Sequence, residues 1–248
     1  HVFGNMADME EVMDIAQKFH LKVVEDATEA LGTKYTEGKY KGKYAGTIGD
    51  YGAYSFNGNK IITTGGGGAI TAKRKEETAY IRYLSTQAKD DPHYYAVGYN
   101  YRMTNVQAAI GVAQIEELPE FIKRKNVNYH YYKQKLDRND MEMRLLSFRS
   151  GTSSNQWFYA VELPIEKMDC DLKTVIEELQ NQREVQTRPI WGLIHEQRPY
   201  RNALIYRIEK AGYYSQRIIN IPCSTQLTMQ EIELVVEAIR DIIGKHIH

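Results

Sequence analysis

The most informative segment of the chain, residues 54–68, reads Tyr54-Ser55-Phe56-Asn57-Gly58-Asn59-Lys60-Ile61-Ile62-Thr63-Thr64-Gly65-Gly66-Gly67-Gly68. It predicts an apolar strand that places one amine, Lys60, in a glycine-rich turn, with the hydroxyl of Ser55 five residues earlier. An amine is nucleophilic only when neutral, and burial at a strand-to-turn junction favours the neutral form. The segment therefore predicts a lysine presented to an aldehyde cofactor. The alternative, commoner for glycines after a strand, is an ordinary turn.

A second informative segment is the short apolar run Leu21-Lys22-Val23-Val24-Glu25-Asp26. It predicts a strand with Asp26 at its carboxyl end, where open α/β sheets bind their ligands. A pyridinium cofactor needs a carboxylate against its ring nitrogen, because the protonated ring is the better electron sink. Asp26 is a candidate for this role. The alternative is that Asp26 caps a helix that begins after it.

Three blocks of sequence together resemble one known family. They read Val24-Glu25-Asp26-Ala27-Thr28-Glu29-Ala30-Leu31-Gly32, then Gly49-Asp50-Tyr51-Gly52-Ala53-Tyr54-Ser55-Phe56-Asn57-Gly58-Asn59-Lys60, then Gly98-Tyr99-Asn100-Tyr101-Arg102-Met103-Thr104-Asn105 with Gln107-Ala108-Ala109. The chain resembles the DegT/DnrJ/EryC1/StrS sugar aminotransferases, which are pyridoxal phosphate enzymes of fold type I. Within the family, these blocks of sequence most resemble the enzymes that aminate 4-keto nucleotide sugars, including those on the bacillosamine, legionaminic acid and perosamine routes.

The resemblance implies a role for each matching residue. Lys60 corresponds to the lysine that holds the cofactor covalently and moves a proton between substrate and cofactor, and Asp26 to the acid on the pyridine nitrogen. Ser55 matches a hydroxyl that binds the cofactor phosphate. Asn100 matches an asparagine that contacts the phosphate bound in the other subunit of a homodimer. Glu29 stands where the family usually has a glutamine near the cofactor's phenolic oxygen. A carboxylate there would repel a phenolate unless one of the two carries a proton.

The segment Thr187-Arg188-Pro189-Ile190-Trp191-Gly192-Leu193-Ile194-His195 borders the sugar-nucleotide site in the resembling family. Arg188 could meet a diphosphate with its planar guanidinium, and His195 is the second candidate for substrate binding. An ordinary surface loop with one packed tryptophan is an equal alternative. The remaining histidines have no spacing that suggests metal binding, so no metal site is predicted.

The resemblance implies transfer of an amino group, with pyridoxal 5'-phosphate as cofactor, from glutamate to a 4-keto sugar on a nucleoside diphosphate. This reaction would serve bacterial surface-polysaccharide or glycan biosynthesis. One alternative is a pyridoxal phosphate-dependent sugar dehydratase of the same fold, which does not keep the lysine, so Lys60 argues against it. The other is a non-catalytic protein, either a nucleotide-sugar binding module or a truncated scaffold.

Composition excludes some partners. The 248 residues include 32 basic and 32 acidic side chains, so no global basic field favours nucleic acid or an anionic membrane. No stretch approaches the roughly 20 apolar residues of a membrane span, and the first residues lack the layout of a signal peptide. Cys170 and Cys223 form no metal spacing and no disulfide framework. A reducing cytoplasm fits best.

The resemblance implies an α/β fold, the fold type I of pyridoxal phosphate-dependent transferases, with a mixed and mostly parallel sheet. Residues 1–140 are expected to form the C-terminal part of the large cofactor-binding domain with a long linking helix, and residues 141–248 a small C-terminal α/β domain. The family has a further N-terminal part, including a helix whose N-terminus holds the phosphate. We therefore expect that the native polypeptide is longer, or that the missing segment is disordered or supplied in another form. We also expect this chain alone to bind the cofactor weakly if at all.

Local patterns predict the main elements. Capping boxes are expected at Asp8 with Glu11, Thr104 with Gln107, and Thr228 with Glu231. Residues 1–26 read as strand, helix and strand, with His1-Val2-Phe3-Gly4 as a strand end, and Pro119 should kink or split the long helix. Helices are also expected at residues 73–85, which are strongly charged, and at residues 172–181. Strands are expected at residues 157–163 and near Val185 and Ile218. The final helix should have an apolar face formed by Ile232, Val235, Ile239, Ile242 and Ile243.

Overall fold

The computed structural model of the chain describes residues 1–136 and 141–247. It divides into two compact units. Unit 1 consists of His1–Arg124 and Phe148–Trp157, and unit 2 of Lys125–Ser147 and Phe158–His248. The boundary predicted between residues 140 and 141 falls on residues 137–140, which lie outside the described residues.

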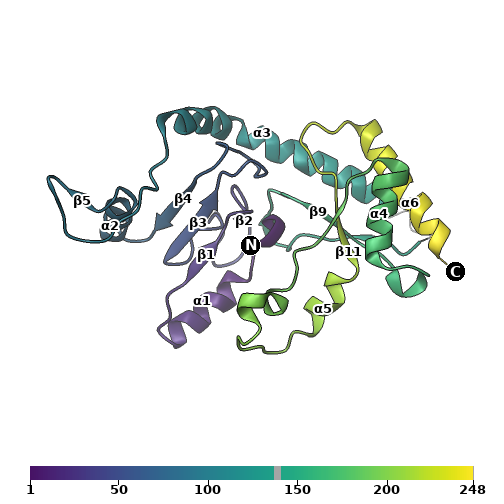
Figure 1. The fold of residues 1–248 in the computed structure, drawn as a ribbon, viewed down its shortest axis with the longest axis horizontal. Helices are drawn as coiled ribbons and strands as arrows, with labels where there is room; N and C mark the ends of the chain where they lie inside the picture. The colour runs from purple at the N-terminus through teal and green to yellow at the C-terminus, as the bar shows by residue number, and fades with distance from the viewer. Residues whose placement is uncertain (137–140, 248) are drawn as a thin grey trace. The chain divides into compact units, whose positions relative to one another are not determined.

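Unit 1 contains a mixed three-stranded sheet with the strand order β1-β3-β4 (Figure 1). The strands are β1 (Val24–Asp26), β3 (Tyr51–Ser55) and β4 (Gly68–Ala72). β1 and β3 are parallel, whereas β3 and β4 are antiparallel and joined by residues 56–67. The carboxyl ends of β1 and β3 and the connection to β4 therefore meet at one edge of the sheet.

Before β1, the chain forms one predicted helix and one element that was not predicted. Helix α1 (Met9–Lys18) begins after Asp8, whose Oδ1 accepts a hydrogen bond from the backbone N of Glu11 at 3.2 Å. The strand predicted at residues 1–4 is wrong, because Val2–Gly4 form a 3-10 helix. Phe3 and Gly4 have φ values of 59° and 83°, which are incompatible with an extended strand.

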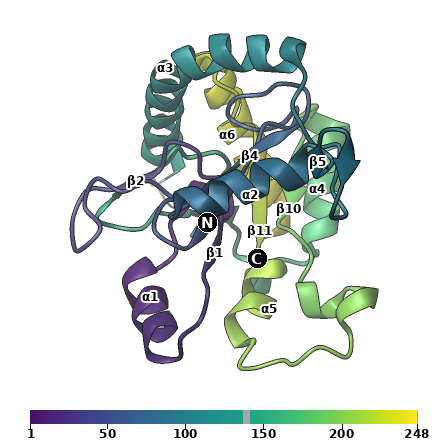
Figure 2. The ribbon, with the colours of Figure 1, turned by 90° about the vertical axis from the view of Figure 1, so that its left-hand side faces the viewer.

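Two further helices of the chain match the predicted capping and charge patterns. Helix α2 (Lys75–Ser85) packs against β4 (Figure 2). Helix α3 (Asn105–Leu136) begins with reciprocal hydrogen bonds, from Thr104 N to Gln107 Oε1 at 3.2 Å and from Gln107 N to Thr104 Oγ1 at 3.3 Å. Pro119 lies inside α3 without dividing it into two helices.

Residues 148–157 belong to unit 1, although residues 125–147 before them belong to unit 2. They contribute one strand of a short antiparallel pair. The strands are β2 (Lys34–Tyr35) and β8 (Thr152–Ser153), and a second small pair is β5 (Lys89–Asp90) with β6 (His93–Tyr94). Directly after β8, the side chains of Ser154 and Asn155 are buried. The side-chain amide of Asn155 donates to residues that follow β1, and the hydroxyl of Ser154 donates to the carbonyl of Gly4 at 2.9 Å, so both hold this segment within unit 1.

Unit 2 is a four-stranded sheet with packed helices. The sheet has the order β10-β11-β9-β7 and consists of β7 (Arg144–Leu145), β9 (Tyr159–Glu162), β10 (Arg188–Pro189) and β11 (Ile218–Ile221). Helix α4 (Leu172–Arg183) packs against β10, β11 and α6 (Met229–His246). The Thr228 and Glu231 capping box of α6 is present, and its five predicted apolar side chains are all buried. The remaining elements are α5 (Glu209–Ser215) and 3-10 helices at Ile165–Lys167, Ile194–Glu196 and Arg198–Tyr200.

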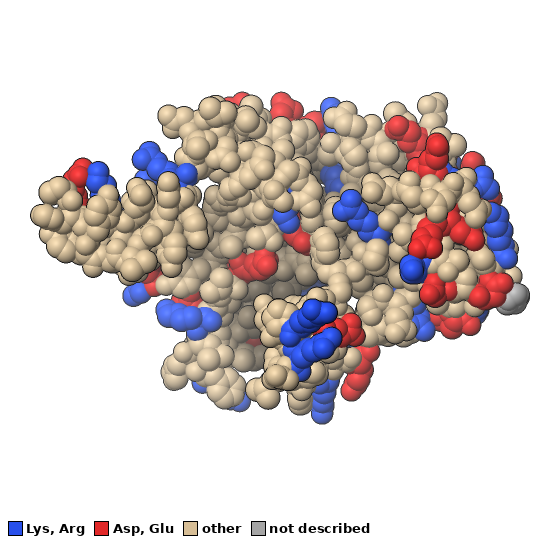
Figure 3. All heavy atoms as spheres, viewed as in Figure 1, with Lys and Arg blue, Asp and Glu red and all other residues tan. Residues whose placement is uncertain are grey.

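The surface agrees with the neutral composition. On the face drawn in Figure 3, acidic and basic side chains are intermingled. None of the helices in the described ranges is both long and apolar enough to cross a membrane.

Candidate active site

Four of the candidate site residues of unit 1 lie where β1 and β3 end or in the segments that directly follow: Asp26, Glu29, Ser55 and Lys60. Asp26 is the last residue of β1 and pairs in register with Ala53 of the parallel strand β3. Ser55 is the last residue of β3, two positions beyond Ala53. The loop that follows carries Lys60. Ligands of α/β sheets usually bind at the carboxyl ends of parallel strands, so we expect a ligand site at this edge.

The loop that carries Lys60 is closed by its own backbone. The N–H of Phe56 donates to the carbonyl of Gly67 at 2.9 Å, and the N–H of Lys60 donates to the carbonyl of Asn57 at 3.1 Å. These bonds bring the two ends of the loop together and form a turn directly before the lysine. Lys60 therefore has a defined backbone position although it lies outside the strands.

The amine of Lys60 lies between a carboxylate and an aromatic ring. Its Nζ is 3.9 Å from Oε1 of Glu29 and 4.2 Å from the centroid of the Trp157 ring. The side chains of Lys60 and Glu29 are only 13% and 14% exposed. The other carboxylate oxygen of Glu29 accepts a hydrogen bond from the N–H of Phe3 at 2.7 Å. Glu29 is thus oriented toward the amine by the 3-10 helix at the start of the chain.

Asp26 is held in its ionised form. Its Oδ1 accepts hydrogen bonds from the N–H and the hydroxyl of Thr28, at 3.1 and 2.7 Å. Partial burial alone would raise the pKa of Asp26, but the bonds from Thr28 and the positive charges of the amino terminus and Lys60 outweigh it. The pKa of this carboxyl therefore lies below its usual value. An ionised carboxylate is the state required opposite a protonated ring nitrogen.

Ser55 offers a hydroxyl proton at the same edge. Its Oγ accepts a hydrogen bond from the N–H of Asn57 at 3.3 Å. Among the described residues no acceptor is paired with the hydroxyl proton itself. A phosphate oxygen would be a suitable acceptor for it.

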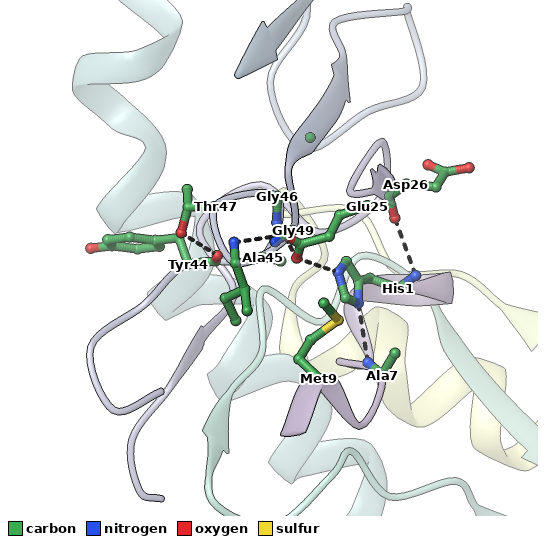
Figure 4. A network of polar contacts seen from close by, with 12 residues as sticks. His1, Ala7, Met9, Glu25, Asp26, Tyr44, Ala45, Gly46, Thr47 and Gly49 are labelled. Atoms are coloured by element: carbon green, nitrogen blue, oxygen red, sulfur yellow. Dashed lines mark hydrogen bonds and ion pairs between the residues drawn. The ribbon is translucent and has the colours of Figure 1, made fainter. Parts of the chain in front are cut away.

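Glu25, next to Asp26, has a different role (Figure 4). Its buried carboxylate accepts hydrogen bonds from the N–H groups of Gly46 (2.8 Å), Ile48 (2.5 Å) and Gly49 (2.5 Å) and contacts Nε2 of His1 (3.0 Å). Burial, together with the charge of Glu25, raises the pKa of Tyr54 to about 12. Figure 4 shows the carboxylate of Asp26 directed away from this cluster. Glu25 therefore anchors residues 45–49, whereas the carboxylate of Asp26 accepts its hydrogen bonds from Thr28.

Sequence reasoning missed Trp157 and Asn155. Trp157 was expected to begin a strand of the small domain, but it belongs to unit 1, and its Nε1–H donates to the carbonyl of Asn59 at 2.8 Å. The Nδ2 of Asn155 donates to the carbonyls of Glu29 and Leu31, both at 3.0 Å. The only signal was the run of polar residues before the tryptophan, which fits neither helical nor strand periodicity.

Asn100 is exposed and lies apart from these contacts. Its backbone forms an isolated antiparallel bridge with Thr86, just after α2. A groove of about 760 Å³ lies beside it, lined by residues of β3, β4, α2 and residues 101–103, but not by Lys60 or Asp26. A role of Asn100 in a site shared between subunits stays a prediction.

Arg188 and His195 belong to unit 2. Arg188 is exposed on β10 and pairs in register with Asn220 of β11. His195 lies in the 3-10 helix Ile194–Glu196 and is half-buried. Their part in substrate binding stays a prediction.

Comparison with known proteins gives one consistent family. The model of the DegT/DnrJ/EryC1/StrS aminotransferase family matches residues 1–240. A GDP-perosamine synthase of Caulobacter vibrioides is 33% identical, over 98% of this chain and 64% of that protein. The dTDP-4-amino-4,6-dideoxy-D-glucose transaminase of Shigella dysenteriae is 27% identical, over 98% of this chain and 65% of that protein. The chain thus spans less than two thirds of the length of these relatives.

Solved structures share the fold. DesI, crystallised in the presence of its TDP-sugar product, has a TM-score of 0.89 and 24% identity, covering 99% of this chain and 61% of its own. The aminotransferase TlmJ of Streptoalloteichus hindustanus has a TM-score of 0.88 and 23% identity, covering 99% of this chain and 65% of its own. The predicted α/β fold class is therefore confirmed. The expectation of a mostly parallel sheet is wrong for the described part of unit 1, because its three-stranded sheet has one parallel and one antiparallel pair.

Proposed function

Because the chain belongs to the DegT/DnrJ/EryC1/StrS aminotransferase family, we propose that it is part of an enzyme that transfers an amino group from glutamate to a 4-keto sugar. The sugar is carried on a nucleoside diphosphate, and the product serves glycan biosynthesis. One observation carries the proposal: Asp26, Glu29, Ser55 and Lys60 meet at one edge of the sheet. The relatives, a GDP-perosamine synthase and a dTDP-4-amino-4,6-dideoxy-D-glucose transaminase, support the substrate class.

The donor set at this edge fits pyridoxal 5'-phosphate. A primary amine, an ionised carboxylate and a hydroxyl proton donor match the aldehyde, the ring nitrogen and the phosphate. When bound, the cofactor would supply an electron sink for the charge left on a substrate carbon. Lys60 would hold it covalently, Asp26 would face the ring nitrogen and Ser55 would donate to the phosphate.

The amine of Lys60 would also move the proton. After the amine of glutamate displaces Lys60 from the cofactor, the released neutral Nζ would take a proton from the α-carbon of glutamate and later give one to the sugar carbon, which is general acid–base catalysis. Glu29 at 3.9 Å and the ring of Trp157 at 4.2 Å fix the position of this atom and exclude water from two sides. The family's usual glutamine would not form an ion pair with the lysine, so Glu29 gives this chain a charged contact to Lys60.

The same proposal assigns residues that contact the substrate and the second subunit. Arg188 and His195 would contact the nucleotide sugar, and Asn100 would reach the phosphate of the other subunit in a homodimer. The enzyme would act in the cytoplasm. Cys170 and Cys223 would stay reduced in that compartment.

Covalent trapping tests the proposal. The protein is mixed with pyridoxal 5'-phosphate and reduced with borohydride, which fixes the cofactor on any amine that holds it. Mass spectrometry should place the added mass on the peptide that contains Lys60. Lys60→Arg keeps the charge beside Glu29 but cannot hold the cofactor, so its peptide should stay unlabelled, whereas Lys41→Ala, a change at an exposed lysine, should not alter labelling. Labelling spread over other lysines, with none on Lys60, would refute the proposal.

The product distinguishes the alternatives. An aminotransferase forms an amino sugar and consumes glutamate, a dehydratase forms a deoxygenated keto sugar, and a binding module changes neither. Chromatography of the nucleotide sugars after incubation with labelled glutamate separates the three outcomes.

A further inference from the structure

A cluster of metal-binding side chains lies in unit 2, apart from the residues assigned above. Asp169, Cys170 and His246 each offer one donor atom, an oxygen, a sulfur and a nitrogen. These atoms all lie within 4.8 Å of one another. In a tetrahedral zinc site, bond lengths near 2.0–2.3 Å separate neighbouring donors by roughly 3.5 Å. Small side-chain movements would therefore bring the three donors to bonding distance of one ion.

The backbone holds the two contributing segments together without a metal. The N–H of Asp169 donates to the carbonyl of His246 at 3.1 Å. One residue further out on each segment, Met168 and Ile247 form an antiparallel bridge. The residues before α4 and the end of α6 are thus already in register, so metal binding would not have to assemble them.

The imidazole of His246 has the surroundings of a metal ligand. Its Nδ1 lies 2.6 Å from Oδ1 of Asp169, and its Nε2 lies 3.2 Å from Oε2 of Glu178 on α4. Metal-bound histidines usually donate their second ring N–H to a carboxylate, which fixes the ring orientation. Glu178 can accept that hydrogen bond while Nδ1, Cys170 and Asp169 face the ion.

The local charge also favours a cation. Asp169 and Glu178 are accompanied by Asp171, whose carboxylate caps α4 through Thr174. The nearest lysine along α6, Lys245, directs its amine to Gln182 at 2.7 Å. The cluster therefore carries more negative than positive charge around His246.

We propose that Asp169, Cys170 and His246 bind a divalent transition-metal ion such as Zn²⁺, with Glu178 as the carboxylate that orients His246. A thiolate and an imidazole select zinc-like ions over Mg²⁺ or Ca²⁺, which prefer oxygen donors. With three protein ligands, a water molecule completes the coordination. The ion fastens the segment before α4 to the end of α6 and is separate from the proposed amino-transfer chemistry.

Cobalt substitution tests this proposal, because a thiolate bound to Co²⁺ gives a near-ultraviolet charge-transfer band. Co²⁺ is titrated into the cofactor-free protein after chelator treatment, under a reductant without thiols. The wild type should show the band, and stoichiometric Zn²⁺ should abolish it. Cys170→Ser should lose the band, whereas Cys223→Ser, which changes the other cysteine, should keep it.

A variant of Glu178 and measurements of thermal stability extend the test. Glu178→Gln should keep the band with about tenfold weaker affinity, as expected for a residue that orients a ligand. Zn²⁺ should raise the thermal unfolding midpoint of the wild type and of Cys223→Ser but not that of Cys170→Ser. Absence of the band in the wild type, or its persistence in Cys170→Ser, would overturn the proposal.

Discussion

Two adjacent carboxylates of β1 have opposite environments. Successive side chains of a strand point to opposite faces of the sheet. Glu25 is accordingly buried and fully engaged by backbone N–H groups, whereas Asp26 is exposed and hydrogen-bonded to Thr28. The position of Asp26 at a strand end could be read from the sequence. The anchoring role of Glu25 could not, because its partners lie 21 to 24 residues away in a loop without regular structure.

The hydroxyl of Thr28 should control the titration of Asp26. The pKa of Asp26 is depressed in the folded chain, so its ionised form stabilises the fold above the unfolded pKa, and this contribution is lost as pH falls through the folded pKa. Thr28→Val removes the 2.7 Å bond and should raise the titration midpoint of Asp26, measured by carbon NMR of the carboxyl group. Thr47→Val, which removes a hydroxyl bonded to the Tyr44 carbonyl, is the control and should leave the midpoint unchanged. An unaltered midpoint in Thr28→Val would show that the hydroxyl does not matter.

Trp157 should stabilise the lysine loop through its indole N–H. Trp157→Phe removes the donor to the Asn59 carbonyl and part of a buried ring. We expect the free energy of unfolding, measured in urea, to fall by about 1–2 kcal/mol. The other tryptophan, Trp191, is 52% exposed, and Trp191→Phe should change stability by less than about 0.5 kcal/mol. Equal effects of the two changes would contradict the assigned role.

At the scale of elements, local sequence patterns predicted where the helices begin. They did not predict that residues 148–157 belong to unit 1. The capping pairs at Thr104 and Thr228 mark the starts of α3 and α6, because capping depends on residues only three positions apart. The return of residues 148–157 to unit 1 depends on pairing between β2 and β8, more than a hundred residues apart in sequence. No local pattern encodes such a contact.

Gly52 should be the least replaceable residue of β3. A Cβ at this position would lie 2.0 Å from the backbone oxygen of Gly46, so either strand or loop would have to move. Gly52→Ala should lower the free energy of unfolding by about 1–3 kcal/mol. Gly58→Ala serves as the matched control, because a Cβ there meets nothing within 4 Å. Urea denaturation of both variants measures the difference, and a neutral Gly52→Ala would argue against the close approach of strand and loop.

At the scale of the whole molecule, the proposed homodimer has a direct test. If Asn100 serves the site of the other subunit, a mixed dimer of Lys60→Ala and Asn100→Ala subunits contains one site with neither change. Two inactive variants should then recover transaminase activity when they are mixed and allowed to exchange subunits. Each variant alone must be severely impaired. Failure to recover activity, with mixed dimers demonstrated by mass spectrometry, would exclude a site shared in this way.

The sequence was most informative about the family and least informative about how the site is enclosed. Three separated blocks identified the family, and strand ends placed Asp26, Ser55 and the Lys60 loop at one edge. The enclosure depends on Trp157, whose hydrogen bond to the lysine loop joins residues 98 positions apart. Such a contact follows from tertiary packing and leaves no periodic trace in the sequence.

The anchoring of residues 45–49 by Glu25 has a kinetic consequence. The amide protons of Gly46, Ile48 and Gly49 lie in a loop, where exchange with heavy water is normally fast. Each of them is bonded to one buried carboxylate, so none can exchange until that carboxylate is exposed. In heavy water these three amides should therefore keep their protons as long as the amides of β1 and β3 do, and the loop should open only together with the sheet.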